Sequence, residues 1–311
     1  MPVRSAKIRV LDNTLQDRHS QSLRKAGIGD YLLLLTAAGM WGGTFLLNEI
    51  ALADFSPVAI AAYRISLAAI ILSLICVWKG LLPKFDGRTL GLLTLISLLN
   101  SVVPFSLIGW GQLTINSATT GILLASSPFF SLLLSHYMTH DDRFSWNKLV
   151  GLFFGFLGVV CLLWQGLFIG SGSLSAMFAV VIAAACYSFS AVLIRRLGPM
   201  PSLLLVASSL AIASLVLLPI LFWWYPPWQQ EYSGITLSAV LFLAIGPTAT
   251  AYVLRVKIVQ NTGAVFMSNV GYLIPLFAVF WGWLFLSQTP TIVMWVSLIL
   301  IFIGIGLGQR K

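Results

Sequence analysis

The stretch that decides the fold is TLGLLTLISLLNSVVPFSLIGWGQLTINSATTGILLASSPFFSLLLS, residues 89–135, which contains no charged residue. A hydrocarbon core about 30 Å thick is crossed by about 20 residues of α-helix, so this stretch is long enough to cross a bilayer twice. Polar residues gather near its middle, at Gln112, Thr114, Asn116 and Ser117, where the chain is expected to turn back. The stretch therefore predicts two membrane-spanning helices joined by a short polar turn.

Similar runs extend over almost the whole chain on both sides of this stretch. Double-length runs cover 149–194 and 258–309, and single-length runs cover 30–53, 57–78, 203–224 and 235–254. The composition, 59% hydrophobic and only 9% charged, lies far from the soluble range of about 45–50% apolar and about 25% charged. A soluble enzyme is excluded, and we expect an all-α polytopic membrane protein with ten transmembrane helices.

The basic residues predict how these helices are oriented. Of the 18 Lys and Arg residues, all except Arg64 fall in the amino-terminal segment, in every second connection or at the carboxyl end. Short loops rich in Lys and Arg stay in the cytoplasm, which predicts cytoplasmic termini and a multi-pass protein of the plasma (inner) membrane. The net charge of +9 thus reflects topology, since a nucleic-acid site needs one basic folded face. Residues 1–29 are expected to form a disordered cytoplasmic tail, because they lack the apolar run of a signal peptide.

The sequence contains an internal repeat of five spans, with matching positions roughly 145 residues apart. The repeat predicts two five-helix units, residues 30–170 and 174–309. Because five is odd, the second unit starts on the opposite face of the membrane, and such inverted repeats allow alternating access to a central cavity. The matched segments are 37–42 with 183–188, Pro57 and Arg64 with Pro201 and Ser208, Pro104 with Pro247, Pro128 with Pro275, and Gly158 with Gly304.

Five further features occur in a characteristic order over roughly residues 31–309: Met40-Trp41-Gly42-Gly43-Thr44-Phe45, the Pro57 to Arg64 spacing, Ser126-Ser127-Pro128-Phe129, Gly151-x-x-x-Gly155-x-x-Gly158-Val159 and Tyr272-Leu273-Ile274-Pro275-Leu276-Phe277. Together they resemble the drug/metabolite transporter superfamily, in particular its EamA-type permeases. The resemblance implies a ten-helix permease that moves small metabolites, in bacteria usually outward across the inner membrane. Family members often carry a Leu-Gly-Glu-like turn after the fourth and ninth helices. The second of these turns reads Leu286-Ser287-Gln288-Thr289 here, without the acidic residue.

Arg64 is the sharpest candidate for a functional residue. A cation inside a span costs about 2.5–3.5 kcal/mol on insertion scales unless it is paired or hydrated. Arg64 lies about 10 Å from the outer end of its helix, and Glu49, near the outer end of the preceding helix, is within geometric reach. Two interpretations stay open: a structural ion pair of Glu49 with Arg64, or a role of Arg64 in binding a substrate carboxylate or in an outer gate. Its repeat mate is Ser208, which favours a one-off role.

Other candidate substrate-binding residues lie near the expected bilayer midplane or beside prolines that free backbone groups for hydrogen bonding. Trp41 and Tyr187 are repeat mates at the midplane, with ordinary packing as the alternative interpretation. The remaining candidates are Asn100, Trp110, Tyr252, Asn269 and Tyr272, and helix kinks are expected at Pro104, Pro128, Pro247 and Pro275.

Motifs for catalysis and for cofactors are missing from the sequence. It contains no Gly-x-Ser-x-Gly, His-Glu-x-x-His or Gly-x-x-x-x-Gly-Lys-[Ser/Thr], so neither an enzyme nor an ATP-driven pump is expected, and no cofactor is predicted. His136, His140 and Asp141 resemble part of a zinc site but lack further ligands, so no metal is predicted. The three cysteines lie inside spans without paired spacing and imply no disulfide.

The combined expectation is a secondary transporter of small metabolites that works by alternating access and exports amino acids or related amphipathic compounds. Import or exchange of a small metabolite or drug is the alternative, and a non-transporting sensor or scaffold is a remote one. The expected partners are the small-molecule substrate and the lipid bilayer. Small-x-x-x-small patterns at Gly151, Gly155, Gly304 and Gly308 let helices approach closely. Packing within a monomer is favoured over a homodimer contact.

Overall fold

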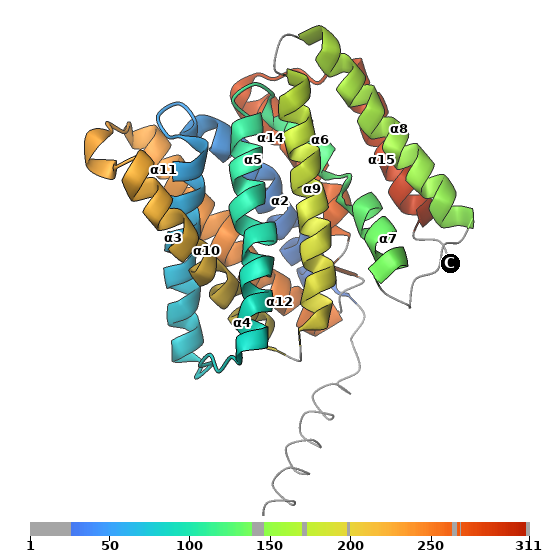
Figure 1. The fold of residues 1–311 in the computed structure, drawn as a ribbon. Helices are drawn as coiled ribbons and strands as arrows, with labels where there is room; N and C mark the ends of the chain where they lie inside the picture. Colours follow the sequence, from blue (N-terminus) through green and yellow to red (C-terminus); the bar gives the residue numbers. More distant parts are fainter. Residues whose placement is uncertain are drawn as a thin grey trace, which may run out of the picture.

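The computed structural model describes residues 26–138, 146–169, 173–197, 200–262, 266–267 and 269–308. Over these ranges the chain is a bundle of helices standing side by side (Figure 1). Residues 1–25 of the predicted tail lie outside the described residues, as do His140 and Asp141 of the zinc-like group.

The helices follow the predicted spans closely. The first five spans are α2 (Ile28–Ala51), α3 (Pro57–Trp78), the consecutive α4, η1 and α5 (Gly87–Ser97, Leu98–Val102 and Val103–Gly111), the pair α6 and α7 (Ser117–Leu124 and Ser127–Met138) and α8 (Trp146–Ile169). The second five are α9 (Ser173–Arg196), α10 (Ser202–Trp224) with the short η2 (Pro227–Gln229), the consecutive α11, η3 and α12 (Gly234–Leu243, Ala244–Thr250 and Ala251–Thr262), α14 (Val270–Leu286) and α15 (Ile292–Gly308). Six of these segments are long and apolar enough to cross a membrane, and α8, α14 and α15 contain shorter apolar helices. The predicted all-α, ten-helix fold class is confirmed.

Side-chain caps start several spans at the turns that the sequence marks. The Asn116 side chain accepts a hydrogen bond from the backbone N–H of Thr119 at 2.9 Å, which starts α6 and turns residues 89–135 back on themselves. The Ser56 hydroxyl accepts one from the N–H of Ala59, with Pro57 at the first helical position of α3. Both caps satisfy N–H groups that a helix start leaves without a partner.

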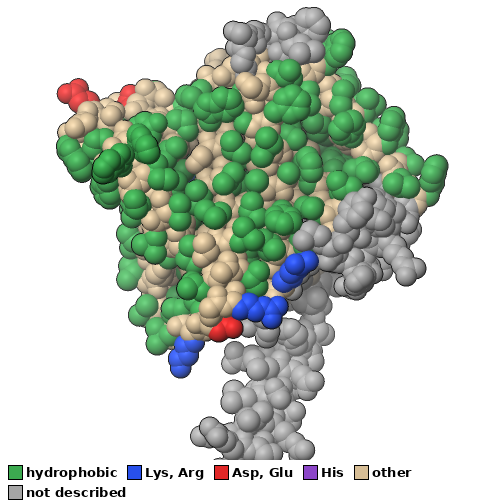
Figure 2. Space-filling model, viewed as in Figure 1, with side chains coloured by type: hydrophobic (Ala, Val, Ile, Leu, Met, Phe, Trp, Pro, Cys, Tyr) green, Lys and Arg blue, Asp and Glu red, His purple; other side chains and the backbone are tan. Residues whose placement is uncertain are grey.

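The sides of the bundle are apolar and its ends differ in charge. Large side chains such as Leu74, Phe153 and Trp223 are exposed. In the coloured part of Figure 2, hydrophobic side chains are spread over the face, and exposed Lys and Arg lie at one end. A surface this apolar calls for lipid rather than water as its solvent. The opposite end is formed by the connections 52–56, 112–116, 225–233 and 287–291, which contain no Lys or Arg. It is called the non-basic end below.

The helices pair in a pattern that repeats between the two halves. The second and fifth spans contact their own counterparts, α3 against α10 and α8 against α15. The first span α2 packs on α14, and its counterpart α9 packs on α7. In the same way α2 packs on α11 and α12, and α9 packs on α5. This exchange of partners is what a pseudo-two-fold axis between inverted repeats produces.

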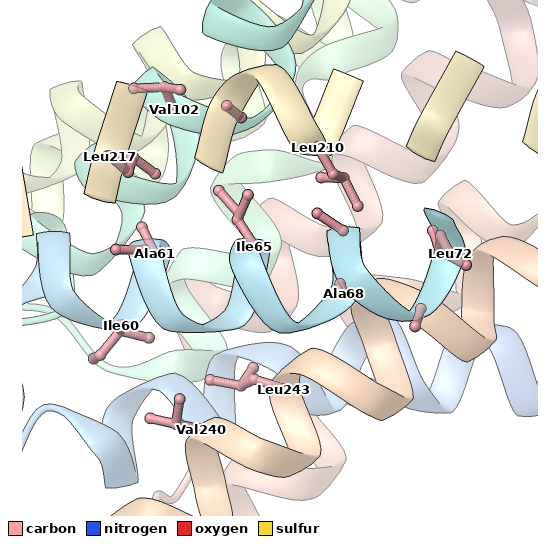
Figure 3. Packing of buried hydrophobic residues seen from close by; sticks show 14 of the residues in the cluster. Ile60, Ala61, Ile65, Ala68, Leu72, Val102, Leu210, Leu217, Val240 and Leu243 are labelled. Atoms are coloured by element: carbon pink, nitrogen blue, oxygen red, sulfur yellow. The ribbon is translucent and has the colours of Figure 1, made fainter. Parts of the chain in front are cut away.

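The largest part of the core surrounds α3 (Figure 3). Ile65 and Ala61 face Leu210 and Leu217 of α10, and Ile60 on the other side of the helix faces α11. Small buried residues, among them Ala61 on α3 and Ala207 and Ala213 on α10, let the two helices approach closely, as in other membrane bundles. Arg64 is therefore held on a helix that is packed on both sides.

Two spans contain a π-helical segment at matching positions of the repeat. The segment η1 lies directly before α5, whose second residue is Pro104, and η3 contains Pro247. Proline has no N–H for the usual i to i−4 hydrogen bond, and a π turn is one way in which a helix accommodates this loss. Pro128 follows the break between α6 and α7, whereas Pro275 lies inside the continuous helix α14.

The fifth and tenth spans approach each other at glycines. A Cβ added at Gly304 would lie 2.6 Å from the Gly151 carbonyl oxygen and 2.6 Å from the Gly155 nitrogen. The small-residue pattern thus brings α8 and α15 together within one chain, in line with the expected packing within a monomer.

Candidate substrate site

A cavity of about 320 Å³ lies in the middle of the bundle, between the two halves. Its volume is in the range of small-molecule sites, which are mostly apolar and carry a few polar groups. Residues of both halves line it: Trp41, Thr44, Phe45, Asn48, Arg64, Asn100, Phe105, Ile108, Gly121, Leu124, Ala125, Ser127, Pro128, Tyr187, Pro247, Thr248, Tyr252, Gly271, Ile274 and Pro275.

Arg64 reaches this cavity from α3 and is only 5% exposed. Its Nε and Nη2 atoms donate hydrogen bonds to the Thr248 hydroxyl oxygen at 3.2 and 3.0 Å. The guanidinium carbon lies 4.1 Å from the centre of the Phe105 ring, a cation–π contact. Both neighbours are neutral, so neither of them balances the positive charge of Arg64.

The ion pair of Glu49 with Arg64, one of the two interpretations that the sequence left open, is not formed. Glu49 accepts hydrogen bonds from the backbone N–H of Ser117 at 2.8 Å and from Nε2 of Gln288 at 2.6 Å. Ser117 is the first residue of α6, and a helix start offers free N–H groups and a positive dipole end to a carboxylate. Glu49 therefore finds its donors at the end of the bundle, while Arg64 points into the interior.

Aromatic side chains from both halves line the cavity. The Trp41 indole Nε1 donates to the Pro247 carbonyl oxygen at 2.9 Å, and its ring packs edge-on against Tyr252 with centroids 6.0 Å apart. Tyr187, the repeat mate of Trp41, lines the same cavity from α9. Such rings offer a large apolar surface together with a polar tip.

The structure gathers only part of the predicted site. Trp41, Arg64, Asn100, Tyr187 and Tyr252 line the cavity, together with Pro128, Pro247 and Pro275. The other candidates lie elsewhere: Glu49 bonds to Ser117 and Gln288, Trp110 is 47% exposed on α5, Asn269 bonds to the Phe266 carbonyl, and Tyr272 packs against Phe302.

Sequence reasoning missed the two residues that contact Arg64. Phe105 directly follows Pro104, and Thr248 directly follows Pro247. Because the two prolines are repeat mates, their next neighbours are mates as well, and both of these neighbours contact Arg64. The position after each proline was the available signal.

A polar cluster, here called the Glu49 cluster, joins three elements at the non-basic end. It consists of Glu49 on α2, Ser117 on α6 and Gln288 after α14, and the Ser117 hydroxyl also donates to Gln288 Oε1 at 2.9 Å. An amide at Gln288 can donate to Glu49, whereas the acidic residue common in the resembling family would repel it. Next to this cluster, Asn48 donates to Gln112 Oε1 at 2.8 Å.

Replacing Gln288 with alanine is expected to destabilise the protein by about 1–3 kcal/mol, because one oxygen of the part-buried Glu49 carboxylate loses its donor. The measurement is the thermal unfolding midpoint of detergent-purified protein. Gln165→Ala is the matched control: the amide of Gln165 makes a longer, exposed contact of 3.4 Å to Thr291, and a change within about 0.5 kcal/mol is expected. Equal midpoints for both variants would show that the Glu49 cluster does not stabilise the fold.

The chemistry of the site is that of binding. One buried cation, five aromatic side chains and a few neutral polar groups suit an amphipathic molecule with a negative group. Within the part of the chain that the structure describes, no three His, Cys, Asp or Glu side chains lie close enough to hold a metal ion.

Comparisons with known proteins agree with this architecture. The model of the EamA-like transporter family matches residues 29–164 and, separately, residues 174–307. The chain is 24% identical over 266 residues to the uncharacterized transporter YdfC of Bacillus subtilis, covering 82% of each chain. It is 29% identical over 276 residues to a protein of Chlamydia trachomatis serovar L2 named S-adenosylmethionine/S-adenosylhomocysteine transporter, covering 83% of this chain and 82% of the relative.

A solved crystal structure of a protein has the same fold. It aligns with a TM-score of 0.62 at 17% identity and covers 91% of this chain and 97% of the other. At this identity the solved structure shows only the fold, whereas the family model matches both repeats and shows the family. The helices form a membrane bundle with a cavity between its halves, and the protein belongs to the EamA-like transporter family.

Proposed function

We propose that this transporter carries amino acids or related amphipathic compounds and holds the substrate carboxylate against Arg64. The observation that carries the proposal is the neutral environment of that residue. Thr248 and Phe105 contact it, and the described residues that line the cavity include no Asp or Glu. A buried cation without a counterion is costly, so a ligand that brings a carboxylate gains binding free energy there.

The rest of the cavity suits the other part of such a substrate. Trp41, Tyr187 and Tyr252 offer apolar surface, and Asn100 offers an amide for an ammonium or other polar group. The relatives named as S-adenosylmethionine/S-adenosylhomocysteine transporters support this assignment. Both named compounds are amino-acid derivatives that join an α-carboxylate to an aromatic base.

Alternating access between the two repeat units, residues 30–170 and 174–309, is the proposed mechanism. At the non-basic end, the Glu49 cluster and the pair Asn48–Gln112 link α2 to α5, α6 and the connection after α14. For the cavity to open toward that side these bonds must break. We take the basic end as cytoplasmic, so both termini lie on the inner side of the plasma (inner) membrane. We further propose that the protein acts as a monomer, performs no catalysis and moves its substrate outward.

Reconstitution in liposomes tests this function. Labelled L-methionine, L-leucine and S-adenosylmethionine are compared with L-methioninamide, which has the same side chain but no carboxylate. Counterflow with preloaded vesicles, with and without a proton gradient, reports transport in either direction and its coupling. We expect saturable transport of at least one carboxylate and none of the amide. Vesicles with verified insertion that carry none of the compounds, or that carry the amide equally well, would contradict the proposal.

A further inference from the structure

We infer that Thr248 is a positioning residue for substrate binding: its hydroxyl fixes the Arg64 guanidinium so that the edge formed by Nη1 and Nη2 stays free for a carboxylate. The inference rests on the proposed function. It adds a residue that acts through Arg64, and it explains why the partner of this buried cation is a neutral hydroxyl.

The hydroxyl of Thr248 is held in place by the irregular helix around it. In an α-helix the Leu243 carbonyl would accept a hydrogen bond from the N–H of the fourth following residue, which is Pro247 and has none. Thr248 is the fifth residue after Leu243, the spacing of a π turn, and its hydroxyl donates to the Leu243 carbonyl at 2.7 Å. Because this bond uses its single hydrogen, the oxygen can only accept from Arg64.

The hydroxyl oxygen of Thr248 has no further hydrogen-bonding capacity, whereas the guanidinium of Arg64 still has N–H groups to donate. The two lone pairs of the Thr248 oxygen accept from Nε and from one hydrogen of Nη2. Of the five N–H groups of the guanidinium, three remain: one on Nη2 and two on Nη1. One hydrogen on each of these atoms points along the same edge, the geometry that binds both oxygens of a carboxylate.

The neutrality of Thr248 matters as much as its position. An Asp or Glu in its place would pair with Arg64 and balance the charge that a substrate would otherwise meet. Phe105 covers the guanidinium at 4.1 Å and is neutral as well. The two residues after the repeat prolines thus differ, one orienting the cation and one packing on it, which fits the absence of a second arginine at Ser208.

The test compares Thr248→Val with Thr248→Ser in the liposome assay with labelled L-methionine. Valine keeps the shape but loses the hydroxyl, so the KM is expected to rise about tenfold with kcat within about twofold, and serine is expected to restore the KM. Thr248→Asp is expected to lose uptake, because its carboxylate competes with that of the substrate. Thr94→Val is the matched control, since the Thr94 hydroxyl donates to the Leu90 carbonyl on an exposed face. A valine variant with an unchanged KM, or one whose KM serine fails to restore, would overturn the inference.

A second measurement does not depend on transport. Phenylglyoxal modifies guanidinium groups, and peptide mass spectrometry reports the rate at Arg64 in the purified protein. Release of the guanidinium in Thr248→Val is expected to speed this reaction roughly fivefold, with Thr248→Ser close to the wild type. If no form carries any of the labelled carboxylates, the proposed function fails, while the modification rate still tests the role of Thr248. An equal rate in the valine variant would overturn the positioning role.

Discussion

Transport by the Arg64→Ala variant is expected to fall at least about 100-fold, while the protein still inserts and folds. The proposed carboxylate contact consists of charge-assisted hydrogen bonds worth about 1.5–3 kcal/mol each, and losing a total near 3 kcal/mol corresponds to about 100-fold. The fold does not need the cation in the same way. Without Arg64, the Thr248 hydroxyl keeps its bond to the Leu243 carbonyl, and a buried charge is removed.

Initial uptake of L-methionine into vesicles and the unfolding midpoint in detergent are the two measurements. Arg64→Lys is expected to keep part of the activity, because it retains the charge but not the planar pair of donors. Arg88→Ala removes an exposed arginine at the basic end and is expected to leave both values unchanged. A large fall in the midpoint of Arg64→Ala with normal uptake per folded molecule would instead assign Arg64 a structural role.

The second large effect is expected at the contact of α8 with α15. Gly304→Val would place side-chain atoms 2.6 Å or less from the backbone of Gly151 and Gly155, and backbone of a neighbouring helix cannot move aside as a flexible side chain can. Overpacking costs about 1–3 kcal/mol and more where helices must separate. We expect a fall of several degrees in the unfolding midpoint and poor recovery of folded protein.

Gly306→Val on the same helix is the matched control, because a Cβ at Gly306 meets no atom within 4 Å. It adds the same atoms and the same loss of backbone freedom without the collision. The comparison is made on detergent-purified protein by thermal unfolding and by the monodisperse fraction. If both variants lose stability equally, the close approach of the helices is not the cause.

Much of the fold was readable in the sequence because a bilayer limits what a chain can do. Residues 89–135 are too long for one span and carry polar residues near their middle, so the sequence predicts a hairpin. Trp41 and Tyr187, which the repeat places near the midplane, line the cavity, as does Asn100, which was proposed because it lies near Pro104. Depth along a span follows directly from residue count.

The partner of Arg64 could not be predicted in this way. Residue count gives the depth of Glu49 and Arg64 but not the direction of their side chains, and Glu49 turns to the start of α6 and to Gln288. Both of those donors are distant in sequence and meet Glu49 only because α2 packs beside α6 and α14. For the same reason the sequence does not show that Asn269 bonds to the Phe266 carbonyl and that Tyr272 packs against Phe302, so that neither lines the cavity.

The number of spans, the duplication of five spans and the intramembrane position of Arg64 follow from the amino-acid sequence, because apolar length and charge are properties of the chain in any conformation. The contacts of Arg64 with Thr248 and Phe105 follow from packing, since both depend on how two proline-bearing helices from opposite halves approach α3. Because Thr248 and Phe105 are both neutral, they leave the positive charge of Arg64 available to a ligand. This environment arises only when three helices pack together.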